Sequence, residues 1–462
     1  MSSLNETLAR SDERGLPPGP RMPSSLQAIG WALRPLSFME RCESRYGELF
    51  TLRVRRGRPW VLLTNPEHAK EVFTTAPELM RSGAREANPL LGPLLGPTSV
   101  MLLDEPHHMD DRKRLLPSFH GTRMQEYGEM MVDVARREIA GWPLGEPFAL
   151  WPRMQAISLE VVMRAVFGEV KGERLELLRE RLVRLTSWVN HPNRLAMLAA
   201  IGPRSITTGS GFEKVMKPVE ELVLEEVRER ALNGNDSGNG QQTILAMLAH
   251  AYADTGSQES DRKMRDELVT MLSDGPTATS LAWVFERLLR HPKKLARLRE
   301  EVLEGESEEY LSAVVTETLR LCPAVPVVMR RLVEPLRLGG YTIPAGTIVA
   351  PCVYLMHRRG DIYPRPLEFR PERFLEEAAG TYTWIPFGGG VRRCVAASFA
   401  PLEMRRVIQT VLREVDLRPA DARSEGVARS SVSFAPDGGA LVIATRRAPS
   451  EADAERRQPV AG

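Results

Sequence analysis

The stretch Phe387–Ala397 reads FGGGVRRCVAA and places three glycines and two arginines directly before a single cysteine. Apolar residues recur at spacings of three and four after Cys394, which predicts an amphipathic helix with the cysteine at its start. A helix N-terminus and the charges of Arg392 and Arg393 favour the thiolate, which is the form of cysteine that binds metal. Glycines let a backbone turn tightly and approach a flat cofactor closely. A small buried cysteine after a glycine-rich turn is the alternative interpretation.

The composition is that of a globular protein without a general affinity for polyanions. Of the 462 residues, 42% are hydrophobic and 26% are charged, and the formal net charge of +2 argues against general binding to nucleic acid or anionic membranes, although local basic patches remain compatible with it. The N-terminus has no apolar run, so we expect no signal peptide, no membrane anchor and a cytoplasmic location. The four cysteines lack paired spacing, which predicts reduced thiols and no zinc site.

The order of patterns along the chain predicts one large, mainly α domain with small β-sheets. An alternating segment at 48–63 indicates a β-hairpin, and Asn65-Pro66 indicates a helix start. Residues 106–291 are mostly helical in pattern, and a second β-rich patch follows at 336–354. We expect a flexible N-terminus at 1–15, a single domain at 16–445 and a disordered tail at 446–462.

The spacing Phe387-x-x-Gly390-x-Arg392-x-Cys394 resembles the haem-thiolate signature of the cytochrome P450 family. The resemblance implies haem b with Cys394 as the proximal iron ligand, and Phe387 as a shield of the sulfur. One departure is Ala396, where the family usually has glycine, and its methyl group should crowd the haem face slightly. We also expect Pro401 to remove one hydrogen bond from the following helix and to kink it.

Glu317 and Arg320 lie three residues apart in a helical pattern, which by itself usually indicates a solvated ion pair. The pair resembles the ExxR motif of the family, and FRPERF (369–374) resembles the segment that accompanies it. The resemblance implies that Arg373 joins Glu317 and Arg320 in a buried network. The expected role of this network is to support the cysteine loop, not to take part in chemistry.

His108 and Arg112 lie four residues apart and therefore on one face of a predicted helix. A solvated, charged helix end explains this spacing by itself. The pair also resembles the HxxxR motif of the family, in which both side chains hold a haem propionate by charge-assisted hydrogen bonds. Arg330 and Arg392 match two further arginines that bind propionates in the family.

The central helix of the family corresponds to residues 266–292, and here the pattern changes. The family usually has an acid followed by threonine, which help to deliver protons to iron-bound dioxygen, but this interval is about two residues short and no alignment restores the pair. We expect Pro276 to break a hydrogen bond within this helix. A proline kink with a structural role is one interpretation. The other is an altered site, in which Asp274, Thr277 or Thr279 relays protons.

The matches follow the order of the family from about residue 16 to residue 445, which implies its fold, a triangular prism with a long central helix over the haem. The implied function is hydroxylation or epoxidation of an apolar small molecule, such as a terpenoid, steroid, fatty acid or polyketide, by a monomer that receives electrons from a ferredoxin or flavodoxin and its NAD(P)H-dependent reductase. We expect this partner to dock near a basic cluster, namely Arg112, Lys113, Arg392, Arg393, Arg405 and Arg406. The alternatives are a haem-thiolate peroxygenase, an isomerase or dehydratase, and a catalytically silent haem-binding protein.

Overall fold

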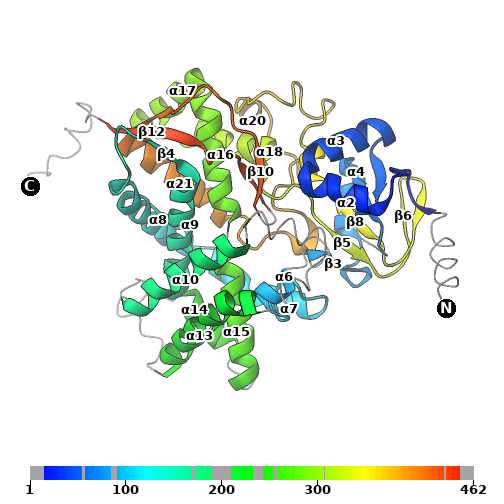
Figure 1. Ribbon diagram of the computed structural model, residues 1–462, viewed down its shortest axis with the longest axis horizontal. Helices are drawn as coiled ribbons and strands as arrows, with labels where there is room; N and C mark the ends of the chain where they lie inside the picture. The colour runs from blue at the N-terminus through cyan, green and yellow to red at the C-terminus, as the bar shows by residue number, and fades with distance from the viewer. Residues whose placement is uncertain are drawn as a thin grey trace, which may run out of the picture.

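Helices form most of the protein, and a β-rich region stands at one side of them (Figure 1). The computed structural model describes residues 15–54, 58–84, 91–168, 172–189, 191, 210–232, 243–252, 257–273, 275–305, 307–430 and 433–447. The N-terminal helices and a five-stranded sheet lie on the right of Figure 1, and the longer helices lie on the left. The expected tails at 1–15 and 446–462 fall almost entirely outside the described residues.

The helices are amphipathic or, near the centre, buried on most sides. The N-terminal and middle helices are α2 (Ser24–Leu33), α3 (Pro35–Tyr46), α4 (Pro66–Thr74), α6 (Leu91–Leu95), α7 (His107–Leu115), α8 (Arg123–Ala140), α9 (Leu150–Phe167), α10 (Glu173–Val189) and α13 (Ser210–Leu232). The later helices are α14 (Ile244–Ala251), α15 (Ser257–Leu272), α16 (Pro276–Leu289), α17 (Pro292–Glu304), α18 (Glu309–Leu321), α19 (Val353–Met356), α20 (Arg373–Glu376) and α21 (Phe399–Glu414). Short 3₁₀ turns occur at Pro77–Leu79, Leu116–Phe119 and Gly390–Arg392.

The strands form small sheets. The five-stranded sheet has the order β1-β2-β8-β5-β3, in which only the β2–β8 pair is parallel. Its strands are β1 (Leu49–Leu52), β2 (Trp60–Leu63), β3 (Met80–Ser82), β5 (Arg330–Leu332) and β8 (Ile348–Pro351). The other sheets are antiparallel and contain β4 (Pro147–Ala149), β12 (Leu441–Arg446) and β9 (Val415–Pro419), then β6 (Leu336–Leu338) with β7 (Tyr341–Ile343), and β10 (Val427–Ser430) with β11 (Ser433–Pro436).

The hairpin and the helix start predicted from the N-terminal sequence are both confirmed. β1 pairs with β2 in antiparallel register, and the Asn65 side chain accepts a hydrogen bond of 2.8 Å from Glu67 N–H to cap α4. The predicted alternation of buried and exposed positions in β1 is wrong. Thr51 is fully buried, and its hydroxyl donates a hydrogen bond of 2.7 Å to the Pro17 carbonyl. The segment that contains Pro17 covers β1, which is the outer edge of the sheet.

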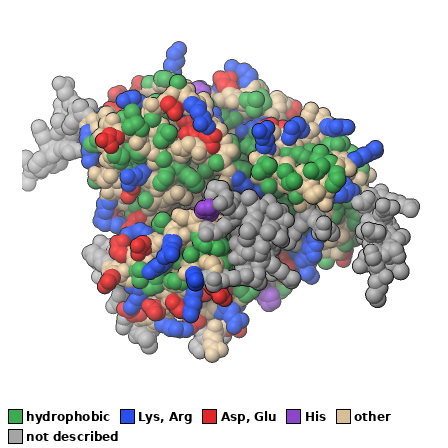
Figure 2. Space-filling model, in the orientation of Figure 1, with side chains coloured by type: hydrophobic (Ala, Val, Ile, Leu, Met, Phe, Trp, Pro, Cys, Tyr) green, Lys and Arg blue, Asp and Glu red, His purple; other side chains and the backbone are tan. Residues whose placement is uncertain are grey.

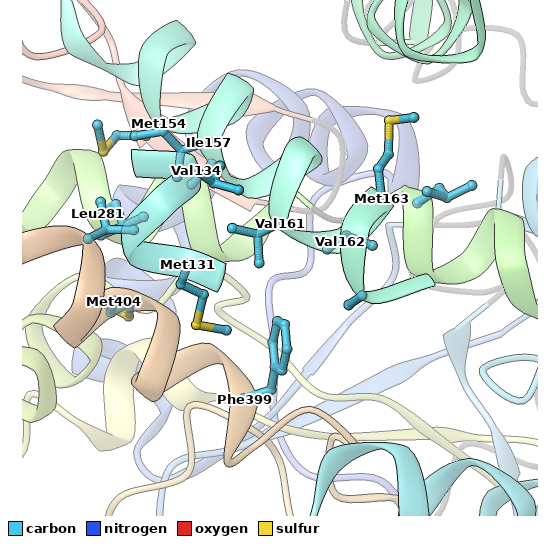
Figure 3. Packing of buried hydrophobic residues seen from close by; sticks show 14 of the residues in the cluster. Met131, Val134, Met154, Ile157, Val161, Val162, Met163, Leu281, Phe399 and Met404 are labelled. Atoms are coloured by element: carbon cyan, nitrogen blue, oxygen red, sulfur yellow. The ribbon is translucent and has the colours of Figure 1, made fainter. Parts of the chain in front are cut away.

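The main core lies among α8, α9, α16 and α21. Figure 3 shows Met131 of α8, Ile157 of α9, Leu281 of α16 and Met404 of α21 in one cluster of buried side chains. Phe399, at the start of α21, belongs to the same cluster and meets Phe119 edge to face, with ring centroids 5.8 Å apart. The helix that follows Cys394 is therefore fixed by apolar packing on its inner face.

The predicted central helix at 266–292 is two helices. α15 ends at Leu272 and α16 begins at Pro276, with Pro276 in the first turn. Because proline has no N–H to donate, it is tolerated at a helix start, where that N–H has no intrahelical partner. α16 is held at its middle by Trp283, whose indole N–H donates to the Phe434 carbonyl at 2.8 Å.

Candidate functional site

The cysteine loop is tightly folded, and α21 begins after it. The Cys394 N–H donates to the Phe387 carbonyl at 2.9 Å, and the cysteine side chain is exposed. The prediction that the helix starts at Cys394 is wrong, because α21 begins at Phe399. Pro401 is therefore the third residue of α21, where its missing N–H removes no intrahelical bond, so the expected kink is also wrong. All four cysteines are free.

The glycines before Cys394 have a structural reason to be glycine. Gly388 and Gly390 have positive φ angles of 69° and 66°, which side chains other than glycine rarely adopt. A Cβ at Gly390 would lie 2.3 Å from the Phe73 carbonyl oxygen, and one at Gly389 would lie 2.5 Å from the Phe73 ring. The loop is thus pressed against the end of α4, and any side chain at these positions would move it.

The structure brings Glu317, Arg320 and Arg373 together in the interior. The Glu317 carboxylate accepts two hydrogen bonds from the Arg320 guanidinium, at 2.7 and 2.9 Å, and one from Arg373 Nε at 3.2 Å. The side chains of Glu317 and Arg320 have no exposed surface. Arg320 also donates to the carbonyls of His357, Pro366 and Glu368. A buried carboxylate is thereby matched by two cations and a backbone N–H, that of Arg370 at 2.8 Å.

His357, which the sequence did not single out, connects this network to the cysteine loop. Its Nδ1–H donates to the Arg320 carbonyl at 3.2 Å, and its Nε2 accepts the Ile385 N–H at 2.9 Å. The two contacts require the neutral ring. Burial, reinforced by the nearby Arg320 charge, lowers the pKa of His357 from 6.5 to about 3. Trp384 adds a second connection, since its indole N–H donates to the Thr316 carbonyl of α18 at 3.1 Å.

His108, Arg112 and Arg392 lie close together around Glu105 and the cysteine loop. His108 Nδ1 donates to Glu105 Oε1 at 2.6 Å, and Arg112 donates to the Arg393 carbonyl at 2.5 Å. Arg392 donates to the Leu103 carbonyl at 2.6 Å and lies 4.0 Å from Glu105 Oε1. Burial and the Arg392 charge lower the pKa of His108, against the opposing effect of Glu105. Arg112 is close enough to Cys394 for the two groups to interact electrostatically.

Arg330 has a guanidinium without an acidic partner among the described residues. Its hydrogen bond is to the neighbouring Met329 carbonyl, at 2.8 Å. Burial, together with the like charge of Arg392, lowers the pKa of Arg330 to about 9. Both arginines line one small hollow with Phe73, Gly389 and Val391. The positive charges of two guanidinium groups at one hollow make it a candidate site for an anion.

The expected proton-relay residues lie at the break between α15 and α16. Thr277 and Thr279 are buried in the first two turns of α16, and the Thr279 N–H donates to the Gly275 carbonyl at 3.2 Å. The Ser280 hydroxyl is committed to the Pro276 carbonyl at 2.9 Å. Asp274 lies outside the described residues.

Two buried carboxylates on α15 hold the segment between α6 and α7. Asp266 Oδ2 accepts the N–H and hydroxyl of Thr98, at 2.9 and 2.7 Å. Glu267 Oε1 accepts the Val100 N–H at 2.7 Å. Burial raises the pKa of Glu267 to about 8, and the nearby negative charges of Asp111 and Asp266 act in the same direction. This contact joins residues more than 160 positions apart, and no motif in the sequence marks it.

The basic cluster expected at the docking face is smaller than predicted. Arg392 is almost completely buried, and Arg405 and Arg406 both pair with Glu308, at 3.3 and 2.6 Å. Lys113 and Arg393 remain exposed at this face. Arg393, the residue before Cys394, is thus one of the exposed cations that remain.

The comparisons with known proteins agree on one family. The family model for cytochrome P450 matches residues 14–438. The chain is 36% identical to a Mycobacterium tuberculosis protein provisionally named cytochrome P450 135B1, over 94% of this chain and 92% of that protein. It is 34% identical to a second protein of that organism, provisionally named cytochrome P450 138, over 94% and 97% of the two chains.

Solved structures show the same fold. Cyanobacterial CYP120A1, solved with retinoic acid bound, matches with a TM-score of 0.80 and 20% identity, over 94% of this chain and all of that chain. The haem domain of cytochrome P450DA matches with a TM-score of 0.77 and 22% identity, over 94% and 98% of the two chains. The fold class expected from the sequence is thereby confirmed. The chain belongs to the cytochrome P450 family of haem-thiolate monooxygenases.

Proposed function

We propose that this protein inserts one oxygen atom from dioxygen into an apolar small molecule, by hydroxylation or epoxidation, and receives its electrons from a separate ferredoxin or flavodoxin with an NAD(P)H-dependent reductase. The observation that carries the proposal is the exposed Cys394 thiol on a loop fixed by the buried Glu317–Arg320–Arg373 network. The substrate class is a terpenoid, steroid, fatty acid or polyketide. The proposed catalytic unit is a monomer with a single haem domain at 16–445. The pairing of β12 with β4 and β9 supports the inclusion of the C-terminal strand in this domain.

Haem b fits the residues around Cys394. A dianionic cofactor with two carboxylates suits Arg330, which has no acidic partner among the described residues, and Arg392, which lines the same hollow and lies 3.8 Å from Asp104 and 4.0 Å from Glu105. Among the parts of the chain that the structure describes, no group of three or more His, Cys, Asp and Glu residues is placed to hold a metal ion. A single thiolate ligand, with the remaining ligands supplied by the cofactor, fits this arrangement.

The haem iron, when bound, supplies the oxygen activation, which thiolate ligation favours. The protein's residues have other tasks. Arg112 places positive charge near Cys394 and favours the thiolate. His357 and Trp384 hold the loop in position, and His108, Arg112, Arg330 and Arg392 are proposed to bind the propionates. Thr277 and Thr279 are the candidates for passing protons on the opposite side, with Asp274 as a third.

A second candidate function is peroxide-dependent oxygenation or rearrangement of a substrate without dioxygen. The observation that favours it is the break between Leu272 and Pro276, at the place where the family usually has an acid and a threonine for proton delivery. In a peroxide-dependent reaction, the peroxide itself brings the protons and electrons. Such a reaction therefore depends less on a proton path through the protein.

The haem-thiolate assignment is tested with the reduced carbon monoxide complex. We expect the purified protein to show the red-shifted Soret band that gives the family its name, and Cys394→Ala to lose it. Cys322→Ala is the matched control, because Cys322 is a free, partly buried cysteine outside the loop. Retention of the band by Cys394→Ala would refute the assignment.

The two candidate functions are separated by the source of oxygen. Turnover of a panel of apolar substrates is measured with NAD(P)H and a surrogate ferredoxin and reductase, and in parallel with hydrogen peroxide alone. The leading proposal predicts product from the reductase-driven reaction, with one oxygen atom derived from labelled dioxygen. Product from peroxide alone would favour the second candidate. No product under either condition would favour a silent haem-binding protein.

A further inference from the structure

Helix α2 presents several of its apolar residues to solvent. In α2, Leu26, Ile29 and Leu33 are 52%, 53% and 74% exposed, and they recur at spacings of three and four, on one face. Met22 precedes the helix with the same spacing and is 43% exposed. We call these four residues the α2 stripe. Single exposed apolar residues are ordinary, but a continuous stripe indicates an interaction surface.

The orientation of α2 is fixed by a buried glutamine on its inner face. Gln27 has no exposed surface, and its amide donates to the Pro20 and Met22 carbonyls at 3.1 and 2.9 Å. Its Oε1 accepts the Arg53 N–H at 2.7 Å. Trp31 also faces inward, where its ring meets Trp60 edge to face at 5.3 Å. Rotation of the helix to bury the α2 stripe would break all these contacts. The contacts of Gln27 and Trp31 therefore keep the stripe facing outward.

Arginines surround the α2 stripe. Arg21 and Arg34 stand at its two ends and are exposed, and Arg41 and Arg45 are exposed on the adjoining α3. None of the four has an acidic partner within 4 Å among the described residues. The sequence from 15 to 58 contains eight arginines and three glutamates, namely Glu40, Glu43 and Glu48. Figure 2 shows hydrophobic side chains gathered over the region of α2 and α3, with basic side chains at their edge.

We propose that the protein attaches peripherally to an anionic lipid bilayer through the α2 stripe. An apolar helix face rimmed by unpaired arginines matches both layers of such a surface, since the apolar side chains enter the acyl boundary and the guanidinium groups bind the phosphates. No helix among the described residues is long and apolar enough to cross a membrane, and α2 itself has only ten residues. The helix therefore lies on the bilayer. This inference is independent of the proposed reaction.

The test is co-sedimentation of the full-length haem protein with vesicles. We expect binding to vesicles of equal parts phosphatidylglycerol and phosphatidylcholine, and weaker binding to phosphatidylcholine alone. The triple variant Leu26→Gln, Ile29→Gln, Leu33→Gln should lower the partition coefficient by about tenfold or more, because the apolar contact is lost. Arg21→Gln and Arg34→Gln should each lower it by about fivefold at low salt, and wild-type binding should weaken at high salt.

The matched control is Leu367→Gln, because Leu367 is 72% exposed, close to the 74% of Leu33, but lies far from α2 in the sequence. It should leave vesicle binding unchanged, and every variant should keep the carbon monoxide spectrum of the wild type. Equal binding by the triple variant and the wild type would overturn the proposal, as would the absence of binding to either vesicle. Self-association in sedimentation velocity that the triple variant abolishes, without vesicle binding, would instead assign the stripe to a second copy of the chain.

Discussion

The region around Cys394, called the cysteine side, and the break between α15 and α16 are built differently. The cysteine side is held by a continuous buried network, from Glu317 and Arg320 through His357 to the loop. At the break, by contrast, the central helix is interrupted between Leu272 and Pro276. The cysteine loop thus keeps the signature of the family except at Ala396, whereas the break lies where the family usually has an acid and a threonine.

The largest effect is expected from Glu317→Gln on the cysteine side. The change removes the one carboxylate between two buried guanidinium groups, so we expect a loss of about 3–5 kcal/mol in the free energy of unfolding, together with poor haem retention. Urea denaturation and the haem-to-protein absorbance ratio measure this. Glu368→Gln is the control, because its half-exposed pair with Arg365, at 2.9 Å, should be worth less than about 1 kcal/mol. Equal effects of the two changes would contradict the scaffolding role.

At the helix break, Thr277→Val tests whether a hydroxyl moves protons. If Thr277 takes part in proton delivery, reductase-driven product formation should fall by about a hundredfold while NAD(P)H consumption continues. Peroxide-driven turnover should change little, because it does not need that delivery. Ser280→Ala serves as the comparison, since its hydroxyl is bound to the Pro276 carbonyl. A variant as active as the wild type would assign the proton path to other groups.

The cysteine side should weaken in acid. The neutral His357 ring accepts the Ile385 N–H, and its pKa is lowered from 6.5 to about 3, so the unfolded chain binds a proton that the folded chain excludes. The resulting stability is present above pH 6.5 and declines on acidification, by up to about 1.4 kcal/mol per pH unit. His357→Leu should be less stable than the wild type by about 1–3 kcal/mol at pH 7.5. The difference should shrink as the pH falls, and a constant difference would argue against a neutral ring.

A pH dependence of the opposite sign is expected at Glu267. Its pKa is raised from 4.5 to about 8, so the folded protein keeps a proton that the unfolded chain releases, and this stability is lost as the pH rises through that window. Glu267→Gln can still accept the Val100 N–H and does not titrate. Between pH 5 and 7.5, the free energy of unfolding of the variant should rise relative to that of the wild type by about 1.4 kcal/mol or less per pH unit. Parallel pH profiles for the two proteins would show that Glu267 is ionised in the native state.

Local chemistry made some features predictable from the sequence. The cap at Asn65 and the β1–β2 hairpin depend on neighbouring residues alone, so the local sequence pattern was enough to predict them. The meeting of Glu317 with Arg373 is a contact across 56 positions, and only the resemblance to a known family predicted it. Contacts without a motif were not predictable. The pairing of Arg405 and Arg406 with Glu308 removed two charges from the expected docking face, and His357 stands alone in its segment, with no spacing that marks it.

The helix break also shows why an altered central region does not disturb the rest of the fold. Two residues fewer in a continuous helix would turn everything beyond them by about 200°, at 3.6 residues per turn. Here α16 is held independently, by Trp283 on the Phe434 carbonyl and by its buried surroundings, so a change in length before Pro276 would not have to turn it. We therefore expect the junction between the two helices to tolerate insertions and deletions. Libraries that vary the chain length there are a route to new reactions on an unchanged scaffold.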